Sequence, residues 1–153
     1  MKTSKILITT DFSNSSLAAL EFISKADEYL SSEITILHVN ESLDFFITQS
    51  NEYGIPLDYN SFEESNRNHN LKLLNELKNT YFNNHHCLTD ILNTNSDISE
   101  DVCQYAKQNK FDLIAISTRG HTKLGALLLG STTQRILLLT EIPVLVIPSN
   151  KEE

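Results

Sequence analysis

STRGHTKLGALLLGST, residues 117–132, is the most informative stretch of this chain, because it leads from a buried-strand pattern into a helix start. Gly130 lets the backbone approach an anion closely, and the free N–H groups and the dipole of the following helix attract negative charge. The stretch therefore predicts a phosphate-binding site at Gly130, Ser131 and Thr132. Because serine is also a preferred N-cap residue, a simple helix cap is the alternative for Gly130 and Ser131.

Outward from this stretch, strand-like and helix-like patterns alternate. Short apolar runs predict five strands, at residues 5–10, 34–39, 87–92, 111–117 and 143–148. Amphipathic stripes predict four helices, marked by Ala19 to Leu30, by Leu73, Leu74, Leu77 and Tyr81, by Ile98 to Ala106, and by residues 131–139. Ser96 or Asp97 is available to cap the third of these helices.

This alternation predicts an α/β fold, with a single-domain, open, five-stranded, mostly parallel sheet that is Rossmann-like and covered by helices on both faces. Such sheets bind ligands beyond the carboxyl ends of their strands, at the switch point of the chain. Those ends carry Thr9, Thr10, Asp11, Val39, Asn40 and Ser117. We therefore expect the binding site among these residues.

Composition limits the class of partner. The chain has 153 residues, 40% of them hydrophobic and 21% charged, which fits one globular domain over residues 1–150 with a polar tail at 151–153. The formal net charge of −8 argues against binding to nucleic acid or to an anionic membrane. Any anion site must therefore be local.

The first 30 residues lack a long apolar segment, so we expect a cytoplasmic protein. Cys87 and Cys103 show no Cys-x-x-Cys spacing, and a disulfide is not expected in that compartment. The turn after the first strand, residues 10–16, contains no glycine. It therefore matches neither the dinucleotide-binding turn of dehydrogenases nor a Walker A loop.

The late glycine spacing resembles that of the universal stress proteins, whose nucleotide-binding members carry G-x2-G-x9-G-[ST] before the last helix. The aligned residues here are Ser117, Gly120, Gly130 and Ser131. The resemblance covers nearly the whole chain. It extends to the Ser-rich turn at Asp11 and to three further segments, Leu37-His38-Val39, Asp112-Leu113-Ile114 and Pro143-Val144-Leu145-Val146.

This resemblance implies the strand order 3-2-1-4-5 and a regulatory protein that holds ATP without dedicated catalysis, with or without Mg²⁺. ADP and AMP are alternative ligands. It also implies a homodimer formed through the last strand, which comprises Pro143, Val144, Leu145, Val146, Ile147 and Pro148. The implied nucleotide-binding residues are Thr9, Thr10, Asp11, Val39, Ser117, Arg119, Gly120, Gly130, Ser131 and Thr132. Among them, Asp11 would meet the adenosine, Val39 would lie beside the adenine, and Gly130 to Thr132 would bind the phosphates.

Two positions depart from the family pattern, because Ser117 replaces a glycine and Ser96 lies near another common glycine. We expect Ser117 either to carry the strain of a positive φ or to donate its hydroxyl to a phosphate. The interpretation of strain predicts that glycine at 117 tightens ATP binding.

Several residues have competing interpretations. Asp11 is also suited to turn formation or helix capping, and Arg119 to a solvated loop rather than a phosphate contact; His121 is the weaker candidate for such a contact. His38 is best interpreted as a hydrogen-bonded strand histidine, with no metal partner at ligand spacing. The adjacent His85, His86 and Cys87 lead into a strand and are not expected to bind a metal.

The polar segment from Glu41 to Asn60 is long for a connection and is interpreted as either a lid or a packed turn. Three function classes are consistent with the sequence: a nucleotide-binding regulatory module, a nucleotide-free dimeric interaction protein, and an enzyme acting on ATP. We favour the first. The late loop offers Arg119, His121, Lys123 and hydroxyls but no base or metal carboxylate for efficient hydrolysis.

Overall fold

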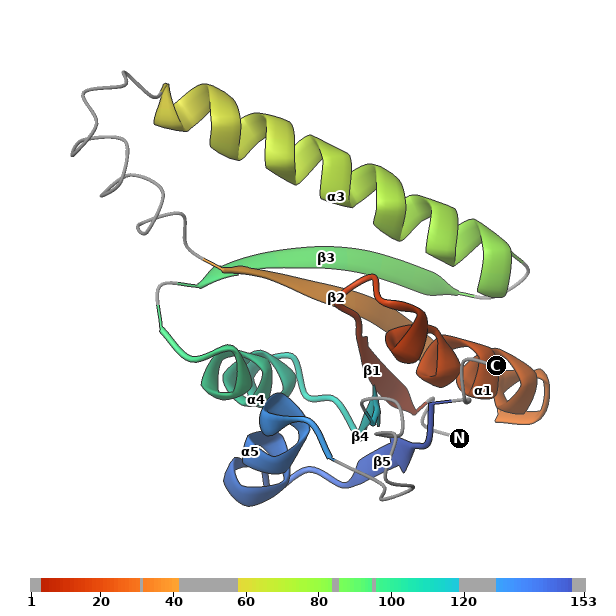
Figure 1. Cartoon of the computed structure of the whole chain (residues 1–153). Coiled ribbons are helices and arrows are strands. Elements are labelled where there is room, and N and C mark those ends of the chain that lie inside the picture. Colours follow the sequence, from red (N-terminus) through yellow and green to blue (C-terminus); the bar gives the residue numbers. More distant parts are fainter. Residues whose placement is uncertain are drawn as a thin grey trace, which may run out of the picture.

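Five parallel strands form one sheet in the order β3-β2-β1-β4-β5 (Figure 1). The computed structural model describes residues 4–30, 32–41, 58–83, 86–94, 96–118 and 129–149, with only the backbone at 27–30 and 59. The strands are β1 Lys5–Thr9, β2 Glu33–Glu41, β3 Cys87–Thr94, β4 Leu113–Ser117 and β5 Val144–Ile147. The expected α/β class and the strand order 3-2-1-4-5 are confirmed.

The helices cover both faces of this sheet, as right-handed crossovers between parallel strands require. They are α1 Asn14–Leu30, α3 Tyr59–Tyr81, α4 Ile98–Gln108 and α5 Ser131–Leu139. Helices α1 and α3 pack on one face, and α4 and α5 pack on the other (Figure 1). None of the helices in the described ranges is both long and apolar enough to cross a membrane.

The alternation of side chains along β1 divides the core into two clusters. Ile6 and Ile8 pack towards α1 and α3, whereas Leu7 between them packs towards α4 and α5. All three are almost completely buried. A central parallel strand buries both faces, which explains why the sequence here is a continuous apolar run rather than an alternating one.

The bounds of the polar segment after β2 change at both ends. The polar segment expected at 41–60 is shorter, because Glu41 is the last residue of β2 and Tyr59 is the first of α3. Asp58 caps α3 by accepting a hydrogen bond from the Ser61 amide at 3.2 Å. Residues 42–57 lie outside the described residues, as do His85, Arg119, Gly120, His121 and Lys123.

Candidate functional site

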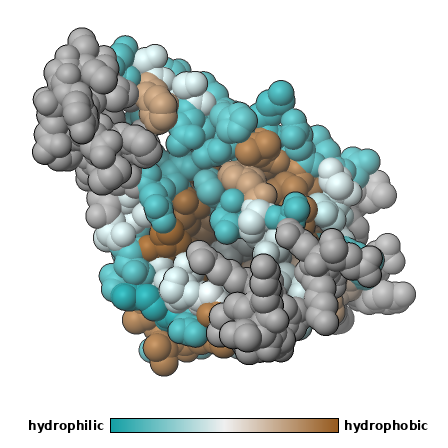
Figure 2. All heavy atoms as spheres, viewed as in Figure 1, coloured by the Kyte–Doolittle hydropathy of each residue, from teal (hydrophilic) through white to brown (hydrophobic). Residues whose placement is uncertain are grey.

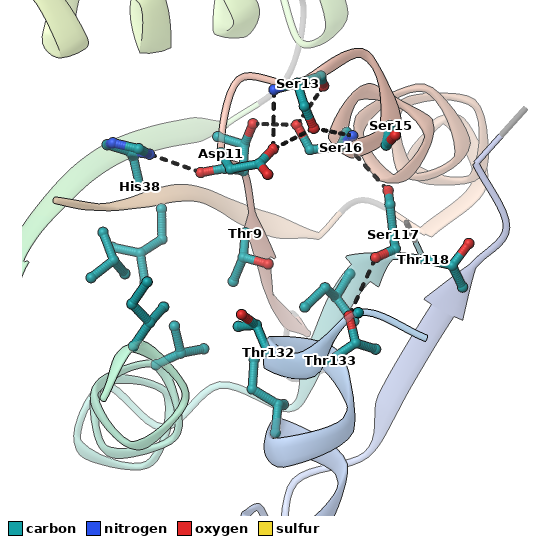
Figure 3. Close-up of a pocket in the computed structure, with 18 of the residues that line it drawn as sticks. Thr9, Asp11, Ser13, Ser15, Ser16, His38, Ser117, Thr118, Thr132 and Thr133 are labelled. Carbon is teal, nitrogen blue, oxygen red and sulfur yellow. Dashed lines mark hydrogen bonds between the residues drawn. The ribbon is translucent and has the colours of Figure 1, made fainter. Parts of the chain in front are cut away.

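A cavity of about 210 Å³ lies at the carboxyl edge of the sheet, where β1, β2 and β4 end (Figure 3). Seven of the ten residues expected to bind a nucleotide line it: Thr9, Thr10, Asp11, Val39, Ser117, Gly130 and Thr132. Ser131 does not line the cavity but begins α5 between two residues that do. Arg119 and Gly120 lie outside the described residues.

The turn after β1 is held by the side chain of Thr10. Its hydroxyl accepts a hydrogen bond from the Phe12 amide at 3.1 Å and bonds the Ser16 hydroxyl at 2.8 Å. Phe12 has a φ of 63°, one of two positive values among the described non-glycine residues. The His38 ring lies against Phe12 at 4.3 Å, with Nδ1 2.9 Å from the Thr10 carbonyl oxygen. The interpretation of His38 as a hydrogen-bonded strand histidine is confirmed.

Asp11 forms a turn and lines the cavity at the same time. Its Oδ1 accepts hydrogen bonds from the amide and the hydroxyl of Ser13, and that hydroxyl oxygen also lies 3.3 Å from the Ser16 amide, as an N-cap does. Burial acts to raise the pKa of the Asp11 carboxyl, but the hydrogen bonds from Ser13 and Ser16 outweigh it and lower the pKa below its ordinary value. The carboxylate is therefore ionised at neutral pH.

The last residues of β2 extend beyond β1, because the final pair between these strands is Thr9 with Leu37. The Leu37 carbonyl still accepts from the Thr10 amide, and the Ile34 amide donates to the His86 carbonyl on the β3 side. In a strand, the N–H and C=O of one residue point to the same side, and those of the next residue point to the opposite side. The N–H and C=O of Val39 therefore point to the side where β1 has ended, at the cavity.

Helix α5 begins at the cavity with no side chain capping it among the described residues. Gly130 is the N-cap, and its φ of −60° and ψ of 154° are accessible to any residue. Glycine matters here because it has no side chain between the first helical amides and a ligand. The cap is therefore Gly130 and not Ser131, and the predicted phosphate site at this helix start stays a prediction.

The expectation of a positive φ at Ser117 is wrong. The residue belongs to β4, and the positive φ values of the described non-glycine residues belong to Phe12 and Lys110. The Ser117 hydroxyl donates to the Ser16 carbonyl at 3.3 Å and accepts from the Ala19 amide at 2.9 Å. Its single proton is therefore engaged with α1 in this structure, and donation to a phosphate stays a prediction. Ser96 does not line the cavity, and its amide donates to the Thr94 hydroxyl.

The apolar lining residues were not identified as site residues from the sequence. Leu37, Ile98, Val102, Ile116 and Ile136 form this part of the wall. A usable signal exists for two of them, because Leu37 shares a strand face with Val39 and Ile98 is the first residue of α4. The wall provides the apolar surface on which a flat aromatic ring can lie.

The charge of the described lining is acidic. Asp11 and Glu41 are its charged residues, and no lysine or arginine lines the cavity among the residues that the structure describes. Nearby, Arg135 of α5 is paired with Asp97 and Glu100 of α4, each at 3.3 Å. Within the described residues, an anion would therefore be stabilised by the start of α5 rather than by a free cation.

The sheet order and this cavity define an α/β protein with a cavity at the strand switch point, the place where such sheets bind ligands. The universal stress protein family model matches residues 2–148, and the chain belongs to this family. Universal stress protein MJ0577 of Methanocaldococcus jannaschii is 29% identical over 154 residues, covering 94% of this chain and 93% of the relative. Universal stress protein YxiE of Bacillus subtilis is 26% identical over 147 residues, covering 94% of this chain and 97% of the relative.

Solved structures share the fold. The structure of MJ0577 matches with a TM-score of 0.70 at 24% identity and covers 99% of this chain and 100% of that one. A universal stress protein in complex with cAMP has a TM-score of 0.63 at 16% identity, covering 98% of this chain and all of its own. A universal stress protein from Archaeoglobus fulgidus in complex with dAMP has a TM-score of 0.63 at 14% identity, covering 95% and 98%.

Proposed function

We propose that this chain is a regulatory module that binds an adenine nucleotide, with ATP as its principal ligand. The observation that carries the proposal is the meeting of three features at one cavity: the peptide group of Val39, the ionised Asp11, and the uncapped start of α5 at Gly130. They match, in order, the base, the sugar and the phosphate of a nucleotide.

Each feature suits one part of the ligand. The N–H and C=O of Val39 offer a donor and an acceptor in line, which complements the N1 and N6 edge of adenine. The Asp11 carboxylate accepts hydrogen bonds from ribose hydroxyls. The amides at the start of α5, with the Thr132 hydroxyl, are suited to phosphate oxygens. Arg119 and Gly120 remain predicted phosphate contacts, and Thr9 and Thr10 line the turn beneath the sugar.

The two structural neighbours in complex with cAMP and dAMP support adenine-nucleotide binding in this fold. The choice of ATP as the principal ligand rests on the spacing of Gly120, Gly130 and Ser131. Mg²⁺ would accompany its phosphates. ADP and AMP are the alternative ligands, and competition titrations against ATP distinguish them.

We also propose that the module has no dedicated catalysis. Hydrolysis of ATP needs a base that orients water near the γ-phosphate. The Asp11 carboxylate binds Ser13 through Oδ1 and would bind the ribose, and Nδ1 of His38 is engaged with the Thr10 carbonyl. A turnover assay with purified protein tests this point, and a rate above that of slow background hydrolysis would contradict it.

A homodimer through residues 143–148 is part of the proposal. Strand β5 is an edge of the sheet, and Val144, Leu145 and Val146 are only partly buried in the single chain. Unpaired strand edges are templates for pairing with a second copy. Apolar surface also gathers over α5 in Figure 2, where Leu138 is 84% exposed. Leu145→Lys should give a monomer in sedimentation, and a monomeric parent protein would contradict the dimer.

A cytoplasmic location remains part of the proposal. The decisive experiment on function is acid extraction of freshly purified protein, followed by chromatography of the released nucleotide and titration of the emptied protein with ATP. Released or titratable adenine nucleotide supports the proposal. A blank extract together with a flat titration would favour a nucleotide-free interaction protein.

A further inference from the structure

The segment of β2 that borders the cavity is supported by a strand on one side only. From His38 to Glu41, β2 pairs with β3 but no longer with β1. His38, Val39 and Glu41 all line the cavity. A strand end paired on one side frays more easily than a central strand. Something else must therefore hold these four residues if the peptide group of Val39 is to recognise a base.

A chain of side-chain amides provides this support. Asn70 of α3 donates to Asn40 of β2 at 2.7 Å, and Asn40 donates to its register partner Asn93 of β3 at 3.0 Å. Asn93 then donates to Glu63 at 3.0 Å, so this series of hydrogen bonds both begins and ends on α3. Glu63 and Asn70 are about two turns apart and so lie on the same face of this helix.

Two members of this series of hydrogen bonds, Asn40 and Asn70, are buried, which makes the bond between them costly to break. Asn40 and Asn70 are each only 8% exposed. A buried amide that loses its partner destabilises the folded protein, whereas an exposed one is compensated by water. Hydrogen bonds in such a chain also polarise one another. The α3 face of β2 is therefore fixed most firmly at Asn40, between two residues that line the cavity.

We propose that Asn40, Asn70 and Asn93 are positioning residues of the nucleotide site. By tying the overhanging end of β2 to α3 and β3, they hold the N–H and C=O of the neighbouring residue Val39 in place at the side where β1 has ended. This inference rests on the proposed function, because it assigns a role in binding to residues that touch no ligand. Helix α3 thereby becomes part of the site's support.

The first test measures the ligand-free protein by amide hydrogen exchange. The peptide groups of even-numbered β2 residues point towards β3, as the bond from Ile34 to His86 shows. In Asn70→Ala, protection of the Asn40 amide should fall about tenfold, while that of Ile36 in the same ladder should not change. Asn68→Ala is the control, since this residue is exposed on the same helix.

The second test is calorimetric titration with adenosine and with AMP. Asn70→Ala should weaken both ligands by the same factor, about five- to tenfold, because the base contact is common to them. Glu63→Ala, at the accessible end of the series of hydrogen bonds, should weaken the binding of both ligands by a smaller factor. This variant can be used instead if Asn70→Ala folds poorly. Asn68→Ala should bind like the parent protein.

The outcomes separate two failures. If the parent protein binds neither ligand, the proposed function is wrong. If the parent binds but the Asn70 and Glu63 variants bind equally well, with unchanged exchange at Asn40, the amides only stabilise the fold and this inference is wrong. A loss confined to AMP, with adenosine unaffected, would also overturn it, because the effect would then lie at the phosphate end.

Discussion

The starts of helices α4 and α5 both reach the cavity, but the protein treats them in opposite ways. Asp97 caps α4 by accepting hydrogen bonds from the amides of Ser99 and Glu100 at 2.9 and 3.2 Å. Gly130 begins α5 without a side-chain cap. At the start of any α-helix, the first amides have no partner within the helix, and the helix dipole is positive there. Under the proposed function, α4 is capped for stability, whereas α5 is left uncapped to receive a ligand.

The largest effect should come from making α5 resemble α4. Gly130→Asp places a carboxylate on the open amides, so the affinity for ATP should fall at least about a hundredfold through like-charge repulsion. The same change should stabilise the fold slightly, by a few tenths of a kcal/mol, because aspartate is a better N-cap than glycine. Calorimetric titration and thermal melting measure the two effects.

Gly130→Asn is the control for that experiment, since it adds a neutral cap of similar size. It should weaken ATP binding much less than Gly130→Asp. If both variants bind ATP like the parent protein, the phosphates do not lie at the start of α5. If Gly130→Asp unfolds the protein, the stabilising part of the comparison is wrong.

A smaller effect is expected at the sugar end. Asp11→Asn should weaken adenosine binding about tenfold by removing a charged acceptor. The parent protein should prefer adenosine to 2′,3′-dideoxyadenosine, and the variant should lose this preference. Competition titrations measure both ligands. Equal preference in parent and variant would place the ribose elsewhere.

The same residue gives a pH dependence of stability. The pKa of Asp11 in the folded protein lies below its ordinary value of 3.8, so its stabilising contribution is complete above that value. The contribution is lost as the pH falls through the lower, folded-state pKa. Between neutral pH and pH 5, Asp11→Asn should therefore show the same pH dependence as the parent protein, and the two should diverge only below pH 4 in denaturant melts.

At α4, the expected effect is on stability alone. Desolvation acts to raise the pKa of Asp97, but the amides of Glu100 and Ser99 and the charge of Arg135 outweigh it, so the pKa is lowered. Asp97→Ala removes this cap, and the melting temperature should fall by roughly 2–4 °C. Its ATP affinity should remain within about twofold of the parent. A large loss of affinity would mean that α4, and not α5, meets the ligand.

The smallest effect on binding should be at Ser117. Since its hydroxyl bonds the α1 backbone at Ser16 and Ala19, Ser117→Ala should cost about 1 kcal/mol of stability. ATP affinity should change by less than about twofold, both for alanine and for glycine. Tighter ATP binding by Ser117→Gly would contradict this account, because it would mean that the backbone at residue 117 is strained after all.

The sequence predicted the strands and the apolar helices because their periodicity directly reflects burial. It missed the first half of α3, because most of residues 60–69 are exposed and leave no apolar stripe. At the site, turn and helix-start residues were predictable from local chemistry. The role of Ser117 was not, because its partners Ser16 and Ala19 lie about a hundred positions away in the chain. The amide chain from Asn70 was hidden for the same reason.

The central claim is that the open start of α5, and not the capped start of α4, receives the phosphates. The most direct test is titration of isotope-labelled protein with ATP and with adenosine, following backbone amide resonances by NMR. We predict that ATP, but not adenosine, shifts the amides of Ser131 and Thr132, while those of Ser99 and Glu100 move little with either ligand. Equal shifts at both helix starts, or shifts at Ser99 and Glu100 alone, would contradict the claim.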